Sequence, residues 1–236
     1  MPALEIDGAL PAETRALARL IRDRHSCRAF LSTPVPRATI DTMLTIAQGS
    51  ASWCNSQPWQ AIVTEGAATE RFRAALHAHA TSTDWANEMP DFAFPERYVG
   101  IYKERQRETG WALYRSVGVA FGDRAASARQ MLENFRLFGA PHVMIVTTEA
   151  DLGVYGAIDC GAYVAHLMLV AQSLGIATIA QAALASVSGF VRAHFAIPPE
   201  RRIVCGISFG YADTGHPANA FRTTRAPLDQ VVRYEG

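Results

Sequence analysis

A long apolar segment, from Gly161 to Leu174, limits the folds open to this sequence. Only His166, Gln172 and Ser173 interrupt it. A helix that is apolar nearly all round has no side to turn to water, so it is normally buried in a core or against another subunit. The segment is shorter and more polar than a membrane span requires. We therefore expect a fold that covers this helix on several sides, and no association with a membrane.

The bulk composition fits a large core. The 236 residues are 49% hydrophobic and 19% charged, and the formal net charge is zero. Such a charge balance argues against a broad surface for nucleic acid. The first ten residues include Glu5 and Asp7 and no apolar core, so they do not form a signal peptide. We expect a cytoplasmic protein with reduced thiols and no metal site, since no metal-ligand spacing joins its cysteines, Cys27, Cys54, Cys160 and Cys205.

Apolar periodicity predicts helices and strands intermixed along the chain. Asp123 and Ser186 are candidate N-caps, and Gly49, Gly139 and Gly175 are candidate helix stops. No strand is followed by a GxGxxG turn, so we do not expect a Rossmann nucleotide site. The expected helices lie around Leu17–Ile21, Ile40–Ala47, Phe72–His79, Ala128–Phe138, Tyr155–Leu174 and Phe190–His194. The expected strands are Gln60–Thr64, His142–Thr147, Ile176–Ala180 and Arg202–Phe209.

The segment from Thr83 to Phe121 departs from this regular pattern. It combines many charges with aromatic residues, among them Trp85, Trp111 and Tyr114. We interpret it as an excursion or lid over a pocket, within a single domain that spans residues 1–236. Trp111 and Tyr114, with Phe135 and Phe138 further along, are candidates to line a substrate pocket. Packing of these aromatics into the protein is an equally good explanation.

Two short motifs carry most of the functional information. The first is Arg24-His25-Ser26-Cys27-Arg28, and the second runs from Ser52 to Trp59 with the sequence SWCNSQPW. Guanidinium groups suit phosphate because their fork of donors can bind two oxygens at once. Amide and hydroxyl groups on a rigid loop suit the edge of a heteroaromatic ring. Together the motifs indicate a site for a phosphorylated cofactor that carries a ring.

The order and spacing of these motifs resemble the FMN-dependent nitroreductase family, most closely the branch that includes nitrobenzoate reductases. The resemblance implies an α+β fold with a central mixed, mainly antiparallel sheet flanked by helices. It also implies an intertwined homodimer with FMN sites shared between the subunits. Similarity continues through Phe138–Pro141, Asp159–Gly161, Ser173–Gly175, Gln181–Leu184 and Arg222–Arg225.

The same resemblance implies roles for particular residues. Arg24 and Ser26 of the first motif would hold the ribityl phosphate, and Arg28 would lie near the pyrimidine edge of the flavin. His25, between Arg24 and Ser26, would be a further cofactor contact. The remaining expected cofactor contacts come from three further segments. These are Ser52, Trp53, Asn55 and Gln57 on a loop from the partner subunit, Gln181 and Ala182 beside the flavin N5, and Arg222 and Arg225 at the phosphate.

The implied activity is a ping-pong transfer of hydride from NAD(P)H through flavin to an electron-poor small molecule, such as a nitroaromatic or a quinone. The flavin N5 carries the chemistry, so no catalytic side chain is expected. Two alternatives stay open at this point. One keeps FMN but performs ene reduction, dehalogenation or dehydrogenation, and the other is a flavin-binding sensor or storage protein without fast turnover.

Overall fold

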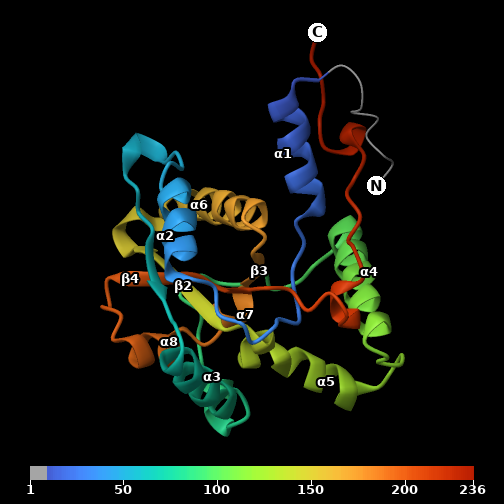
Figure 1. Cartoon of the computed structure of the whole chain (residues 1–236). Coiled ribbons are helices and arrows are strands. Elements are labelled where there is room, and N and C mark those ends of the chain that lie inside the picture. Colours follow the sequence, from blue (N-terminus) through green and yellow to red (C-terminus); the bar gives the residue numbers. More distant parts are fainter. Residues whose placement is uncertain (1–9) are drawn as a thin grey trace.

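A four-stranded antiparallel sheet organises the computed structural model, which describes residues 10–236 (Figure 1). The strands are β1 (Gln60–Val63), β2 (His142–Glu149), β3 (Ala177–Gln181) and β4 (Arg201–Gly210), in the spatial order β1-β2-β4-β3. All three strand pairs are antiparallel, and a single bridge between Ser26 and Thr178 is parallel. The α+β class and the mainly antiparallel sheet are confirmed. The first ten residues are predicted not to form a signal peptide, and residues 1–9 of them lie outside the described part.

Helices cover both faces of this sheet. The α-helices of the described part are α1 (Ala12–Asp23), α2 (Arg37–Ala47), α3 (Ala67–Ala80), α4 (Gly100–Ser116), α5 (Arg124–Leu132), α6 (Gly153–Ser173), α7 (Ala182–Ala185) and α8 (Ser188–Phe195). In Figure 1, α2 and α6 lie on one side of the sheet, with α3, α7 and α8 on the other. Side chains of β2 alternate between the two layers. Met144 and Val146 join the α2–α6 core, whereas Val143 and Ile145 join the opposite core.

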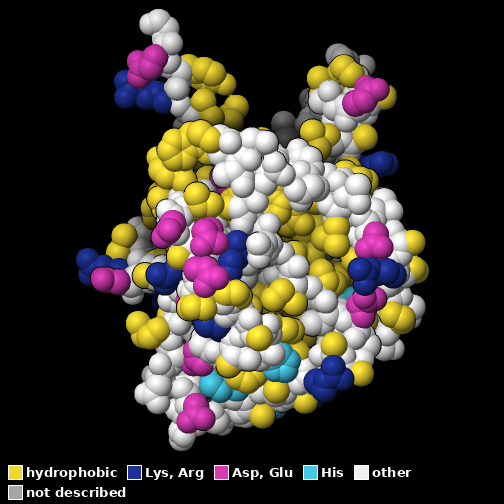
Figure 2. Space-filling view, turned by 90° about the vertical axis from the view of Figure 1, so that its left-hand side faces the viewer, with side chains coloured by type: hydrophobic (Ala, Val, Ile, Leu, Met, Phe, Trp, Pro, Cys, Tyr) yellow, Lys and Arg dark blue, Asp and Glu magenta, His cyan; other side chains and the backbone are white. Residues whose placement is uncertain are grey.

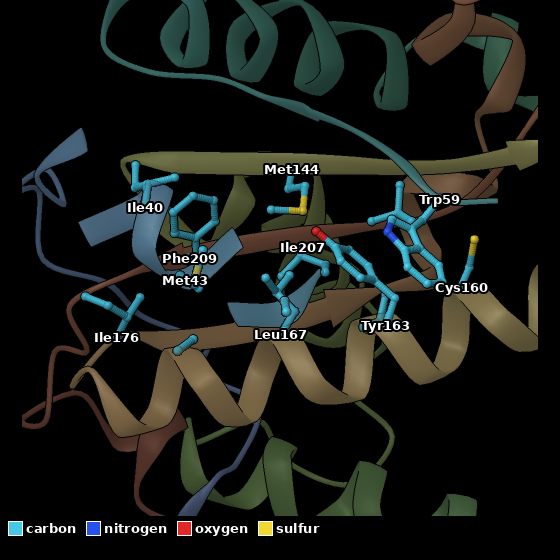
Figure 3. Close-up of a cluster of buried hydrophobic side chains, with 14 of the residues drawn as sticks. Ile40, Met43, Trp59, Met144, Cys160, Tyr163, Leu167, Ile176, Ile207 and Phe209 are labelled. Carbon is cyan, nitrogen blue, oxygen red and sulfur yellow. The ribbon is translucent and has the colours of Figure 1, made fainter. Parts of the chain in front are cut away.

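The predicted apolar helix is α6, and it supplies much of the α2–α6 core (Figure 3). Tyr163 stacks on Trp59, with ring centroids 5.0 Å apart and an interplanar angle of 11°. Cys160 and Leu167 point from the same helix toward the sheet and are 0% and 1% exposed. Burying a large apolar side chain stabilises a fold by about 1.5–3 kcal/mol. This row of contacts therefore fixes α6 firmly along the sheet.

The opposite side of α6 is left exposed by residues 10–236. Val154, Tyr155 and Ile158 are 65%, 54% and 57% exposed. The helix is longer than the sequence predicted, because it starts at Gly153 and continues for 21 residues. With the turn before it, it is long and apolar enough to cross a bilayer, a test that core helices of water-soluble proteins also pass. The expectation that the fold covers α6 on several sides is therefore only partly met by residues 10–236.

Two local predictions are wrong for tertiary reasons. The helix expected to reach Phe138 ends at Leu132 and continues as a 3-10 turn, in which Leu137 and Phe138 adopt left-handed φ angles of 57° and 52°. This turn directs both side chains into the core, where they are 0% and 6% exposed. Ser186 does not cap α8, because its hydroxyl donates to the Ala183 carbonyl at 2.6 Å.

The amides at the start of α8 bond instead to a carboxylate from the excursion. Glu88 accepts from the Gly189 and Phe190 amides, each at 3.0 Å. A Cβ at position 189 would lie 2.9 Å from a Glu88 oxygen, so the glycine leaves room for this contact. Asp91 accepts from the Ile203 amide at 2.7 Å and pairs with Arg192 at 2.6 Å. The root of the excursion is thus fixed to the body, and α4 extends beyond it (Figure 1).

Candidate functional site

The first motif leaves α1 as extended chain and runs beside β3. The Cys27 amide donates to the Thr178 carbonyl at 3.0 Å, and its thiol is fully buried. Successive side chains of extended backbone point to opposite sides. Because Cys27 faces the core, Arg24, Ser26 and Arg28 share the other side. All three are half-buried.

Four guanidinium groups meet around this motif. Arg222 and Arg225, from the far end of the sequence, lie close enough for their charges to act on His25 and Arg24 respectively. Burial, and then the charge of Arg225, lower the pKa of Arg24. Arg24, Arg28, Arg222 and Arg225 form no ion pair with any carboxylate in residues 10–236. Uncompensated cations held this close together favour binding of an anion.

The surroundings of His25 lower its pKa, which favours the neutral form of its ring. Burial lowers its pKa, and the positive charges of Arg222, Arg24 and Arg28 lower it further, against the opposing effect of a hydrogen bond to Asp23. That bond joins Nδ1 to the Asp23 carbonyl oxygen at 3.0 Å. Since a carbonyl oxygen only accepts, Nδ1 carries the proton. Nε2 is therefore available as an acceptor.

Asn219 fixes the position of Arg28, and sequence patterns did not single it out. Its Oδ1 accepts from the Arg28 amide at 2.7 Å, while its Nδ2 donates to the carbonyls of Ala29 and Asp213, both at 2.9 Å. The ring of Phe221 lies 5.5 Å from the guanidinium carbon of Arg28. These contacts are with residues far away in the chain, so no local spacing announces them. Asn219 thus holds the backbone of Arg28, and burial beside Phe221 leaves its guanidinium partly desolvated.

The second motif forms a tight loop in front of β1. Cys54, Asn55 and Gln57 adopt left-handed φ angles of 52°, 55° and 45°. The Ser52 hydroxyl oxygen accepts from the Gln57 amide at 2.9 Å, so its own proton is free for a ligand. The exposed side-chain amide of Asn55 makes no hydrogen bond with other described residues. Trp53 is 63% exposed and packs against Tyr155, with ring centroids 4.6 Å apart.

The two motifs do not meet within one chain. The loop packs against Tyr155 and Asp159 in the first part of α6, whereas Ser26 lies beside β3, which follows the other end of that helix. A helix of 21 residues spans about 30 Å. A site that uses both motifs therefore needs a second copy of the loop.

Of the other predicted site residues, Gln181, Phe135 and Phe138 are buried, whereas Ala182 is exposed. Gln181 is 2% exposed, and its side chain accepts from Ser208 at 2.5 Å and donates to the Asn134 carbonyl at 2.9 Å. That side chain is therefore used inside the protein, while Ala182, the next residue, is exposed. Phe135 and Phe138 are 1% and 6% exposed, which places both in the core. Their predicted contact with substrate stays a prediction.

Trp111 and Tyr114 of the excursion are half-buried, whereas Trp85 packs edge-on against Phe135 in the core. Trp111 stacks on Phe121, with ring centroids 4.8 Å apart, and contacts Tyr114 edge-on at 6.3 Å. Together with Glu108, Arg115 and Val119, the Trp111–Phe121 pair lines a shallow pocket. Glu108 also accepts from the Thr224 hydroxyl at 3.2 Å. The excursion thus touches the C-terminal segment that carries Arg222 and Arg225.

Comparison with known proteins agrees with these features. The family model described as the nitroreductase family matches residues 21–211. A 4-nitrobenzoate reductase from Nocardioides sp. (strain LMS-CY) is 35% identical over 96% of this chain and 92% of its own. Nitroreductase NfnB of Mycolicibacterium smegmatis (strain ATCC 700084 / mc(2)155) is 34% identical over 93% of both chains.

Solved structures show the same fold. The crystal structure of the FMN-dependent nitroreductase NfnB from Mycobacterium smegmatis in complex with NADPH superposes with a TM-score of 0.89, at 32% identity, over 95% of this chain and 100% of that one. An FMN- and NADPH-dependent NfnB from Sphigopyxis sp. strain HMH also gives 0.89, at 29% identity, over 93% and 99%. On its motifs, fold and relatives, this chain belongs to the nitroreductase family.

Proposed function

We propose that this protein is an FMN-dependent oxidoreductase that moves hydride from NAD(P)H to an electron-poor acceptor such as a nitroaromatic or a quinone. The observation that carries the proposal is the set of four guanidinium groups without a carboxylate partner among residues 10–236. A phosphate monoester carries a charge of about −1.5 to −2 at neutral pH, which matches such a cluster.

The donor groups of the chain fit FMN. Arg24, Ser26, Arg222 and Arg225 would hold the phosphate, and the neutral His25 could accept a hydrogen bond beside it. Arg28 would face the pyrimidine edge. Asn219 holds its backbone and the Phe221 ring contacts its guanidinium, so the cation is in place before any charge develops. When bound, FMN accepts hydride from NAD(P)H and delivers it to the acceptor, so the protein contributes binding and electrostatics.

We further propose that the site is shared in a homodimer. The Ser52–Gln57 loop of one copy would complete the basic cluster of the other, since the two lie at opposite ends of α6. Both α1 and α6 leave apolar residues uncovered, including Leu17 and Ile21 at 50% and 55% exposure. Figure 1 shows α1 and the C-terminal end extending from the body on the same side. In Figure 2, two arms project above a surface with many hydrophobic side chains, which suits an intertwined partner.

The remaining expectations complete the proposal. The chain acts as a single domain in the cytoplasm, with the excursion over the acceptor site. No protein acid or base is required for the hydride step, because water can supply the protons. Trp53 and Gln57 would support the ring-facing loop, and the backbone of Gln181 and Ala182 would pass the flavin N5.

Anaerobic reduction of the purified protein tests this function. We expect a yellow protein whose released cofactor has the mass of FMN, and rapid bleaching on addition of NADPH or NADH. A nitroaromatic should then restore the colour, and steady-state rates should give the parallel double-reciprocal lines of a ping-pong mechanism. FAD, no flavin after reconstitution, or a flavin inert to both donors would contradict the proposal. Bound FMN that is inert would favour the sensor or storage alternative.

A further inference from the structure

We propose that Asp159 is the positioning residue that holds the flavin-facing loop, Ser52–Gln57, in its binding conformation. The inference rests on the proposed function for the identity of the ligand. It concerns the carboxylate of Asp159 and its hydrogen bonds to the loop, which lie in the first part of α6.

The loop requires an external hold because its backbone is strained. Cys54, Asn55 and Gln57 all have positive φ angles of 45–55°. Residues with a Cβ reach this region at an energetic cost, and they persist there only when surrounding contacts impose it. Within the loop, the Gln57 amide bonds to Ser52 Oγ at 2.9 Å, and the Ser56 amide bonds to the Trp53 carbonyl at 3.1 Å. These short-range bonds fold the turn. Two contacts besides Asp159 join it to the body: Gln48 donates to the Gln57 side chain at 3.1 Å, and the Trp53 ring packs on Tyr155.

Asp159 supplies the attachment. Its two carboxylate oxygens both accept from the Trp53 amide at 3.2 Å, and Oδ2 also accepts from the Ser56 hydroxyl at 3.3 Å. The residue is 9% exposed and forms no ion pair with a cation of residues 10–236. A buried carboxylate without a counter-charge is costly unless hydrogen bonds satisfy it. Every hydrogen bond that the Asp159 carboxylate accepts from the described residues comes from this loop. The loop and the carboxylate therefore stabilise each other.

The attachment acts on the groups that would face the ring. Asp159 fixes Trp53 and Ser56, which flank Asn55, and Trp53 follows directly after Ser52. Among the described residues, Ser52 retains a free hydroxyl proton and Asn55 a free side-chain amide. Beyond Gln57 the chain is held separately. Arg201 donates to the Pro58 carbonyl at 3.0 Å, and the Trp59 indole donates to Gln48 at 2.9 Å. Loss of Asp159 should therefore loosen Ser52–Ser56, while Gln57 stays bonded to Gln48 and β1 stays in place.

Hydrogen exchange on the flavin-free protein tests the hold directly. In Asp159→Ala, amides in a peptide covering residues 52–57 should exchange at least about tenfold faster, because hydrogen bonds to a charged group are lost. Asp159→Asn keeps one acceptor oxygen and should show a smaller effect. Peptides from β2 and β4 should be unchanged. The matched control is Cys160→Ala, a neighbouring buried side chain of α6 whose thiol lies near Thr147 and not the loop. Unchanged exchange at residues 52–57 in Asp159→Ala would overturn the proposal.

Flavin binding tests the consequence. Asp159→Ala should weaken binding of FMN and of riboflavin by the same factor, about tenfold to a hundredfold, because the loop faces the ring that both share. Arg225→Ala should weaken FMN alone, since riboflavin has no phosphate. Ser56→Ala should add little in the Asp159→Ala background if both act through one contact.

The outcomes separate the two proposals. Faster exchange in the loop with unchanged affinity for both flavins would overturn a positioning role in flavin binding. A wild-type protein that binds neither FMN nor riboflavin would contradict the proposed function. In that case the exchange experiment on the flavin-free protein still decides whether Asp159 holds the loop.

Discussion

Single residues of the basic cluster give a direct test of where the phosphate lies. Arg24→Ala and Arg225→Ala should each lower FMN affinity about tenfold to a hundredfold, because each removes a charged hydrogen-bond donor worth about 1.5–3 kcal/mol. Fluorescence titration of the flavin-free protein measures the change. The matched control is Arg202→Ala, which changes an exposed arginine at the start of β4 and should leave FMN affinity unchanged. Normal affinity in both test variants would show that the phosphate lies elsewhere.

The cysteines should differ sharply in reactivity. Burial raises the pKa of Cys160 to about 11 and that of Cys205 to about 12, and it also raises the pKa of Cys27. A pKa above the solution pH keeps a thiol protonated, and the protonated form is a poor nucleophile. At pH 8, iodoacetamide should therefore modify the exposed Cys54 first, as identified by peptide mass. Cys54→Ser should lose the fast phase. Fast labelling of any other cysteine in the folded protein would contradict this assignment.

Among the elements, β4 is tied to β2 and to the end of the loop by one buried guanidinium. Arg201 is 7% exposed and donates to the Thr147 carbonyl at 2.8 Å and to the Pro58 carbonyl at 3.0 Å. Arg201→Met should leave these acceptors unsatisfied and destabilise the fold by about 2–4 kcal/mol. Chemical denaturation measures the loss, with the neighbouring Arg202→Met as control. Equal stability of the two variants would show that the network contributes little.

The excursion should govern the choice of acceptor. In Trp111→Ala, the oxidative half-reaction should change from one acceptor to another, while reduction by NAD(P)H and FMN affinity stay near wild type, because Trp111 contacts mainly its own excursion. Stopped-flow kinetics resolves the two half-reactions. Tyr102→Ala, also on α4 and 63% exposed, is the control. A uniform loss of flavin, both half-reactions and thermal stability would instead make Trp111 a structural residue.

For the whole molecule, a charge on the uncovered side of α6 should separate the subunits and release flavin together. Ile158→Asp is suited to this test because Ile158 is 57% exposed. A charge at Leu169, nearer the centre of the apolar segment, would also disturb the chain's own packing, because Leu169 is half-buried. Sedimentation velocity with absorbance at flavin and protein wavelengths measures both effects. Ala74→Asp, exposed on α3 across the sheet, should leave the assembly intact. A monomer that retains flavin would contradict the shared site.

Features with a local cause could be read from the sequence. Apolar spacing located α1, α2, α3 and α6 and all four strands, because periodicity reflects which face of each element is buried. Asp123 was recognised as a cap since its partner, the Ala126 amide at 2.8 Å, is three residues away. The motif around Arg24 and the loop from Ser52 were likewise visible as contiguous chemistry.

Features that join distant segments were decided only by the tertiary structure. Asn219 fixes the backbone of Arg28, and Glu88 binds the start of α8, each across a hundred residues or more. The meeting of Arg225 with Arg24 was implied by the family resemblance, but by no local spacing. In the sequence, nothing marked Asp159 as a partner of the loop, although its carboxylate accepts hydrogen bonds from Trp53 and Ser56. Such pairings leave no periodic or spaced signal, because they depend on packing that brings two segments together. Sequence therefore determined the elements and the cofactor chemistry, and packing determined which residues hold the site.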